Sequence, residues 1–244
     1  MNESDSRAGF PTTRWSRVAH AVNPAALEAR AALAELCGAY WYPIYAFIRR
    51  KGHGPDEALD LTQDYFTRLL ETGVLASADR RRGRFRAFLR TDCGFFLSHN
   101  REQRLALKRG GGQAGLSIDA RDAEGRYLRE PVDATTPERL FDQTWAVNLL
   151  DEVLKQLARE YADTGRATQF EILQGAIGKQ ARHVSYSDLG IQLKTSEVAV
   201  QQAVQRLRKR YKAILRERIA ATLDDPDEAA INDEIRDLFA ALAS

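Results

Sequence analysis

The chain has 244 residues, of which 44% are hydrophobic and 29% charged, and this length suffices for one large or two smaller globular domains. No apolar run approaches the ~18–20 residues that cross a bilayer, and the N-terminus lacks the apolar core of a signal peptide. We therefore expect a soluble, cytoplasmic protein with no membrane association. The two cysteines, Cys37 and Cys93, make neither a disulfide framework nor a metal site.

The net charge of +2 conceals a strong segregation of charge along the chain. Residues 80–109 hold ten cations and two carboxylates, a net charge of +8, and residues 194–218 hold eight cations and two carboxylates, a net charge of +6. From Ile219 onward, seven carboxylates oppose Arg236 alone. Two separate basic blocks favour a protein that grips a polyanion at two places, and solvated surface faces are the alternative interpretation.

Helical periodicity runs through most of the sequence, whereas strand signals are almost absent. Residues 24–50 form one long helical pattern, which Pro43 is expected to kink or divide. A break then precedes a second helix, which begins at Pro55 and ends near Gly73. A third helix is expected over residues 85–108.

Residues 110–136 are rich in Gly, Asp, Glu and Pro and poor in large apolar residues, a composition that predicts a linker. Thr136 and Pro137 then form a strong helix start, and a long amphipathic helix follows. Another helix is expected through residues 170–177, and a short one over 186–193 precedes a longer terminal helix. The predicted fold class is all-α, with two helical domains joined by a flexible linker.

The short helix and the longer helix after it have the spacing of a helix-turn-helix, in which the first helix braces the second and the second enters the major groove of DNA. Val200, Val204 and Leu207 form an apolar stripe on the longer helix. Beside it lies a polar face, where Gln suits adenine, Arg suits guanine and further cations suit phosphates. The candidate DNA-binding residues are Lys194, Ser196, Glu197, Gln201, Gln202, Gln205, Arg206, Arg208 and Lys209. A purely structural helical hairpin is the alternative.

The turn of this motif falls at Lys194, where a left-handed backbone would cost a non-glycine residue about 1 kcal/mol. Two outcomes are open. Either the turn is built differently, or Lys194 accepts the strain beside a phosphate.

Residues 40–47 (YWYPIYAF) and 56–66 (DEALDLTQDYF) resemble the second conserved region of bacterial sigma factors. The resemblance is greatest to the extracytoplasmic-function (ECF) group of the sigma-70 superfamily. Residues 83–89 (GRFRAFL) resemble an aromatic and basic element of that group, and residues 184–210 resemble its terminal helix-turn-helix. The motifs follow the family's order and span most of the chain.

The resemblance implies a sigma factor that binds core RNA polymerase and directs promoter recognition and transcription initiation, without catalytic activity, cofactor or metal of its own. It implies a sigma-2-like domain over residues 10–109, which binds the polymerase clamp and the minus-ten element. The linker covers residues 110–136. A sigma-4-like domain over residues 137–220 would then bind the minus-thirty-five element, and residues 221–244 form an acidic C-terminal extension.

The resemblance also assigns roles to particular residues. Asp60, Leu61, Gln63 and Asp64 would dock on the β′ clamp coiled coil, and the second domain would meet the β flap. The residues assigned to the minus-ten element are Arg80, Arg81, Arg82, Arg84, Arg86, Phe88, His99, Asn100, Arg101, Arg104, Lys108 and Arg109. An anti-sigma factor is a further candidate partner.

Melting a duplex requires cations for phosphates and aromatic rings for unstacked bases. Phe85, Phe88, Phe95 and Phe96 supply rings in the first basic block, and we expect Phe85 and Phe96 to belong to the core. The chain departs from the family here, because Phe88 stands where many members carry Trp, and Gly94-Phe95 where they carry Arg-Asn.

Other functions have weaker support. His20, His53, His99 and His183 form no pair with metal-ligand spacing, and the glycines at 110–112 lack the spacing of a phosphate-binding loop, so an enzyme is not expected. A stand-alone helix-turn-helix transcriptional regulator is the alternative function. A protein-interaction scaffold is a third.

The acidic tail has an apolar face of its own, formed by Ile231, Ile235, Leu238, Phe239 and Leu242. One hypothesis is that the tail packs back on the protein and shields part of a basic region from non-specific DNA, because the charges are opposite. The other is that it completes the core of the second domain.

Overall fold

The structure, a computed structural model, describes residues 27–71, 85–106, 120–130, 136–177, 184–223 and 226–243, with the side chains of 27–37, 70, 101–106 and 120–121 outside the description. Every regular element in these ranges is a helix, which confirms the predicted all-α class. The elements are α2 (Leu27–Arg50), α3 (Pro55–Glu71), α5 (Phe85–Ala106), α6 (Ala120–Tyr127), α7 (Pro137–Asp163), α8 (Ala167–Leu173), the 3-10 helix η2 (Gln174–Ala176), α9 (Tyr186–Leu193), α10 (Glu197–Ala220) and α11 (Glu228–Ala243). No described helix is long and apolar enough to cross a membrane.

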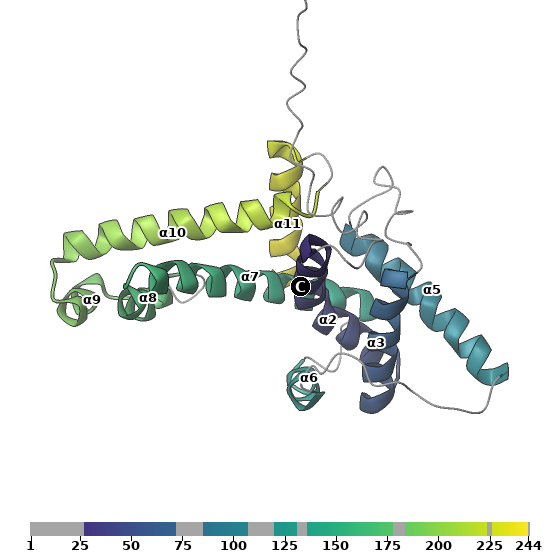
Figure 1. Ribbon diagram of the computed structural model, residues 1–244. Coiled ribbons are helices and arrows are strands. Elements are labelled where there is room, and N and C mark those ends of the chain that lie inside the picture. Colours follow the sequence, from purple (N-terminus) through teal and green to yellow (C-terminus); the bar gives the residue numbers. More distant parts are fainter. Residues whose placement is uncertain are drawn as a thin grey trace, which may run out of the picture. The chain divides into compact units, whose positions relative to one another are not determined.

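Two compact units make up the chain (Figure 1). The first unit contains residues 1–146 and 220–244, and the second contains residues 147–219. The division therefore falls inside α7, ten residues after the boundary expected at residue 137. The acidic extension belongs to the first unit, not to the second domain that one hypothesis assigned to it.

The start signals seen in the sequence begin the helices where they were expected. Pro55 is the first residue of α3, and Asp56 and Glu57 lie in its first turn, at the positive end of the helix dipole. Thr136 caps α7, since its Oγ1 accepts a hydrogen bond from the Arg139 N–H at 3.2 Å. Pro43 lies inside α2 and does not divide it, contrary to one of the two expected outcomes.

In the first unit, α2, α3 and α5 share an apolar core. Its largest members include Tyr45, Phe47, Tyr65, Phe66 and Leu89, all at most 2% exposed. The Tyr65 hydroxyl donates to the Leu89 carbonyl at 3.0 Å, which joins α3 to α5 through a buried hydrogen bond.

A helix occupies the middle of the predicted linker, which corrects the expectation of a flexible segment for the described residues 120–130. Glu124 of α6 accepts two hydrogen bonds from Arg49 of α2, at 2.9 and 2.8 Å, and one from the Tyr45 hydroxyl. The hydrogen bonds from Arg49 lower the pKa of Glu124. The Arg126 guanidinium stacks 3.8 Å from the ring centre of Tyr42. Polar composition suggested a linker here because this segment docks through charges and rings, not through an apolar stripe.

The acidic tail forms α11, with Asp227 as its cap. Its buried residues are Ile231, Glu234 and Leu238, whereas Phe239 is 55% exposed. The buried face is thus rotated from the apolar face expected from the sequence. A carboxylate takes the place of an apolar side chain because it meets a buried arginine.

In the second unit, α10 runs beside the second part of α7, and α8 and α9 lie near the beginning of α10 (Figure 1). Arg210 bridges the two long helices through Glu160, at 2.6 and 2.8 Å, and Arg218 donates to Gln156 at 2.9 and 3.1 Å. The hydrogen bonds between Arg210 and Glu160 raise the pKa of Arg210 and lower the pKa of Glu160.

Candidate nucleic-acid interface

The motif α9–turn–α10 is built as the sequence predicted, over Tyr186–Leu193 and Glu197–Ala220. Ser185 caps α9, where its side chain accepts from the Asp188 N–H at 3.3 Å. Ser196 caps α10 in the same way, accepting from the Ala199 N–H at 3.2 Å. Each helix therefore begins at a serine that satisfies one free backbone donor.

The turn between the helices uses a left-handed residue that is not glycine. Lys194 has φ 52 and ψ 46, so it adopts the left-handed backbone conformation, and the first expected outcome, a turn built differently, is wrong. Its N–H donates to the Ile191 carbonyl at 3.2 Å, and the Thr195 N–H donates to the Gly190 carbonyl at 2.9 Å. These bonds satisfy the last carbonyls of α9 and fix the direction in which the chain leaves it.

Glycine is required one turn earlier, at Gly190. A Cβ atom at this position would lie 2.9 Å from the Thr195 carbonyl oxygen and 3.7 Å from the Glu197 nitrogen. Gly190 is also buried. The missing side chain lets the chain after the turn pass close against α9, and this sets where α10 begins.

On α10 the apolar stripe is buried as predicted. Val200, Val204, Leu207 and Ile214 are at most 1% exposed, and Tyr211 is half-buried. Burial raises the pKa of Tyr211 to about 12. This face fixes the rotation of α10, and therefore which residues point outward.

All nine residues predicted to contact the minus-thirty-five element are exposed. Five of them, Gln201, Gln202, Gln205, Arg206 and Lys209, cover the outer side of α10 and are called the glutamine face below. Arg208 is exposed as well, but its Nε donates to the Ala176 carbonyl at 3.0 Å, which ties it to η2. Arg210, another cation of this helix, is engaged by Glu160 and Glu217 and acts as a brace.

Sequence reasoning did not identify Val198 as part of this surface. Its side chain is 64% exposed in the first turn of α10, beside the glutamine face. It was overlooked because only hydrogen-bonding and charged side chains were assigned to the minus-thirty-five element.

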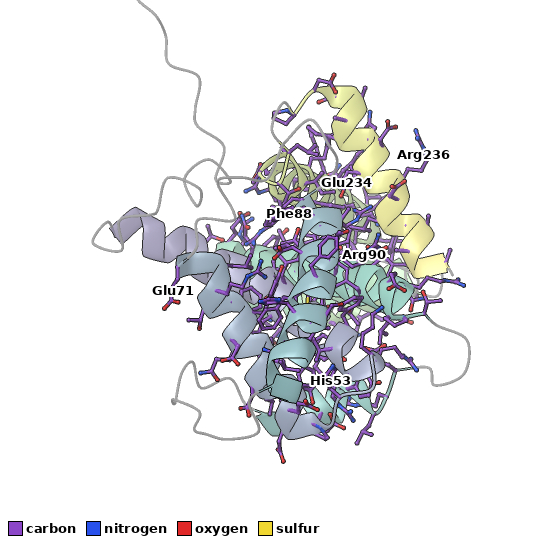
Figure 2. The ribbon with its side chains drawn as sticks, turned by 90° about the vertical axis from the view of Figure 1, so that its right-hand side faces the viewer. His53, Glu71, Phe88, Arg90, Glu234 and Arg236 are labelled. Carbon is purple, nitrogen blue, oxygen red and sulfur yellow. The ribbon has the colours of Figure 1, made fainter. Side chains whose placement is uncertain are left out.

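In the first basic block, Arg86 is not available to DNA, which corrects its assignment to the minus-ten element. It is 9% exposed and pairs with Glu234, with Asp237 at 3.4 Å and with Asp142 at 3.6 Å. Its guanidinium also lies 4.5 Å from the ring centre of Trp145. In Figure 2, Glu234 lies on the side of α11 toward α5, and Arg236 points away.

The aromatic residues of α5 differ in how far they are buried. Phe85 packs edge-on against Tyr40, and Phe96 packs against Tyr65, but both are half-buried and neither is a fully buried core residue as expected. Phe88 is half-buried and stacks on Phe85 at 6.3 Å between ring centres. Phe95, which was not among the residues assigned to the minus-ten element, is 71% exposed.

Among the remaining minus-ten candidates, His99 is exposed and Asn100 is partly exposed near the end of α5. Arg101 and Arg104 belong to the last turns of α5, and their side chains lie outside the description. Arg80, Arg81, Arg82, Arg84, Lys108 and Arg109 lie outside the described residues altogether.

The residues predicted to bind polymerase lie on α3. Asp60 and Asp64 are exposed and Gln63 is partly exposed. Leu61 is 2% exposed and packs in the core, so the exposed face does not include it. Helical spacing placed Leu61 next to the acidic residues, but only the packing of α2 and α5 shows that it points inward.

Similarity to known proteins adds no identification. No protein-family model matches the chain, and no curated protein and no solved structure is significantly similar to it.

Proposed function

We propose that the protein is a sigma factor of the ECF type, which binds core RNA polymerase and directs it to promoters. The observation that carries this proposal is the capped helix-turn-helix, whose second helix exposes the glutamine face while its opposite side is buried. A helix held in this way presents adenine-binding and phosphate-binding groups to a major groove.

The first unit supports the polymerase part of the proposal. Asp60 and Asp64 lie one turn apart on α3 and are both exposed, which suits a basic partner surface. Arg68 of α3 pairs with Asp92 of α5 at 3.1 Å, so the acidic helix is held to the helix that carries the minus-ten candidates.

The test is reconstitution with core RNA polymerase, read as co-elution on size exclusion and as promoter-dependent transcripts. Asp60→Lys places a cation on the proposed contact surface and should weaken the complex with core by tenfold or more through like-charge repulsion. Asp163→Lys makes the same change at an exposed position at the end of α7 and should leave the complex intact.

The DNA arm uses Arg206→Ala, which should weaken promoter binding by the holoenzyme without loss of core binding. Arg159→Ala removes the same charge from an exposed position of the same unit and should have no effect. Failure of the wild-type chain to bind core would reject the proposal. Sequence-specific DNA binding without core binding would instead favour a stand-alone helix-turn-helix regulator.

A further inference from the structure

Val198 is the second residue of α10, and its side chain is 64% exposed in the helix turn that follows the Ser196 cap. A single exposed apolar residue is common on protein surfaces and by itself indicates nothing. The position of Val198 is what distinguishes it, since the N-terminal turns of the second helix of this motif enter a groove most deeply.

The rotation of α10 puts Val198 in the middle of the glutamine face. With ~100° between successive residues, Gln202, Gln205 and Lys209 all fall within about 40° of Val198 around the helix axis. Leu207, which is fully buried, falls on the opposite side. Val198 therefore points away from the core and in the same direction as the groups proposed to read base edges.

Valine gains little burial from folding at such a position. It is β-branched and has a lower helix propensity than the straight-chain residues that usually fill exposed helix positions. A polar or charged residue would serve better if this position met only solvent. The two methyl groups of Val198 would be stabilised by contact with an apolar group of a binding partner.

The major groove of DNA offers one apolar group among its base edges, the 5-methyl group of thymine. Adenine, which Gln binds through two hydrogen bonds, pairs with thymine, so a surface of Gln and Val suits A·T pairs. The flanking side chains Gln201, Gln202 and Gln205 supply the hydrogen-bonding half of such a surface.

We propose that Val198 is a specificity-determining residue that packs against the 5-methyl group of a thymine, and that the duplex site read by α10 contains this thymine beside an adenine bound by one of the glutamines. This inference rests on the proposed function, because it requires α10 to enter a major groove. Beyond the proposed function, it specifies that the base pair contacted by Val198 is an A·T pair.

The experiment replaces thymine by uracil, which removes only the methyl group. Duplexes with a randomised central segment are first selected on the full-length chain in complex with core RNA polymerase. Each thymine of the selected duplex is then replaced singly by uracil. We expect one replacement to weaken wild-type binding about fourfold, the effect of one buried methyl group.

Val198→Ser removes both methyl groups of the side chain. This variant should bind the thymine and uracil duplexes equally at that position, which a double-mutant cycle measures as loss of the fourfold difference. Val147→Ser makes the same change at an exposed residue of α7 and should retain the difference. An unchanged thermal midpoint for Val198→Ser would show that its fold is intact.

Two results overturn the inference. One is equal binding of every thymine and uracil duplex by the wild-type chain. The other is an undiminished preference for thymine in Val198→Ser. In both cases DNA binding itself persists, and the proposed function survives. Absence of any selected duplex would overturn the proposed function and this inference together.

Discussion

Gly190 and Lys194 together determine the path of the chain through the turn of the helix-turn-helix. Lys194 supplies the left-handed turn at a cost of about 1 kcal/mol, and Gly190 supplies the space into which the following chain folds. A glycine at the turn would remove the first cost, whereas at the second position any other residue brings its Cβ too close to the Thr195 carbonyl oxygen. The absent side chain of Gly190 is therefore the stricter requirement.

Gly190→Ala should lower the free energy of unfolding by about 1–3 kcal/mol, the usual cost of overpacking a close contact. The added Cβ meets the carbonyl oxygen of Thr195, and the N–H of that same residue donates to the Gly190 carbonyl, so the chain cannot move away cheaply. Urea unfolding followed by circular dichroism measures the change. Gly175→Ala is the control, because a Cβ there has no neighbour within 4 Å. Equal stability of the two variants would contradict the close approach.

At the scale of elements, α11 is fixed to the first unit by a buried charge. Glu234 is 3% exposed and pairs with Arg86, 148 residues away in the sequence. A buried ion pair adds little net stability compared with apolar residues of the same size. Removing one partner is different, because the other charge stays buried.

Glu234→Ala should therefore destabilise the protein by about 3 kcal/mol, the low end for a broken buried pair, since Asp142 and Asp237 still face Arg86. Asp233→Ala breaks an exposed pair with Arg236 on the same helix and should cost at most about 0.5 kcal/mol. The comparison uses thermal and urea unfolding of both variants. Similar losses in the two would show that the buried pair does not hold α11.

At the scale of the whole molecule, the acidic C-terminal extension contacts the first basic block through Arg86. The acidic extension belongs to the first unit, and Arg86, a member of the first basic block, is already occupied by its carboxylates. This agrees with the hypothesis that the tail masks basic surface. It also shows that the same contact contributes to the core.

A chain ending at Leu223 should bind random DNA severalfold more tightly at low salt, with the difference shrinking as salt is added, because it loses carboxylates and leaves Arg86 with only Asp142 of its described carboxylate partners. Fluorescence anisotropy with a random duplex measures this. Truncation also removes the buried Ile231 and Leu238, so a second variant, Asp233→Asn with Asp237→Asn, retains the helix while it lowers the charge. Unchanged affinity in both chains would refute the masking hypothesis.

The sequence by itself determined the features that depend on neighbours along the chain. Pro55, Thr136 and Ser196 mark helix starts, and the stripe through Val200, Val204 and Leu207 marks the buried side of α10. Caps, prolines and helical periodicity act within a few residues, so they can be read locally. The outward face of the candidate DNA-binding helix followed from the same periodicity.

Only the tertiary structure decided which charged residues pair with a distant partner and become buried or half-buried. The half-buried pair of Arg49 and Glu124 holds a helix inside the predicted linker, and the buried Arg86 and Glu234 pair although they are far apart in the sequence. Charge patterns assign such residues to the surface, because an isolated charge is costly to bury. Partners 75 and 148 residues apart reverse that assignment, since each supplies the opposite charge only once the chain has folded.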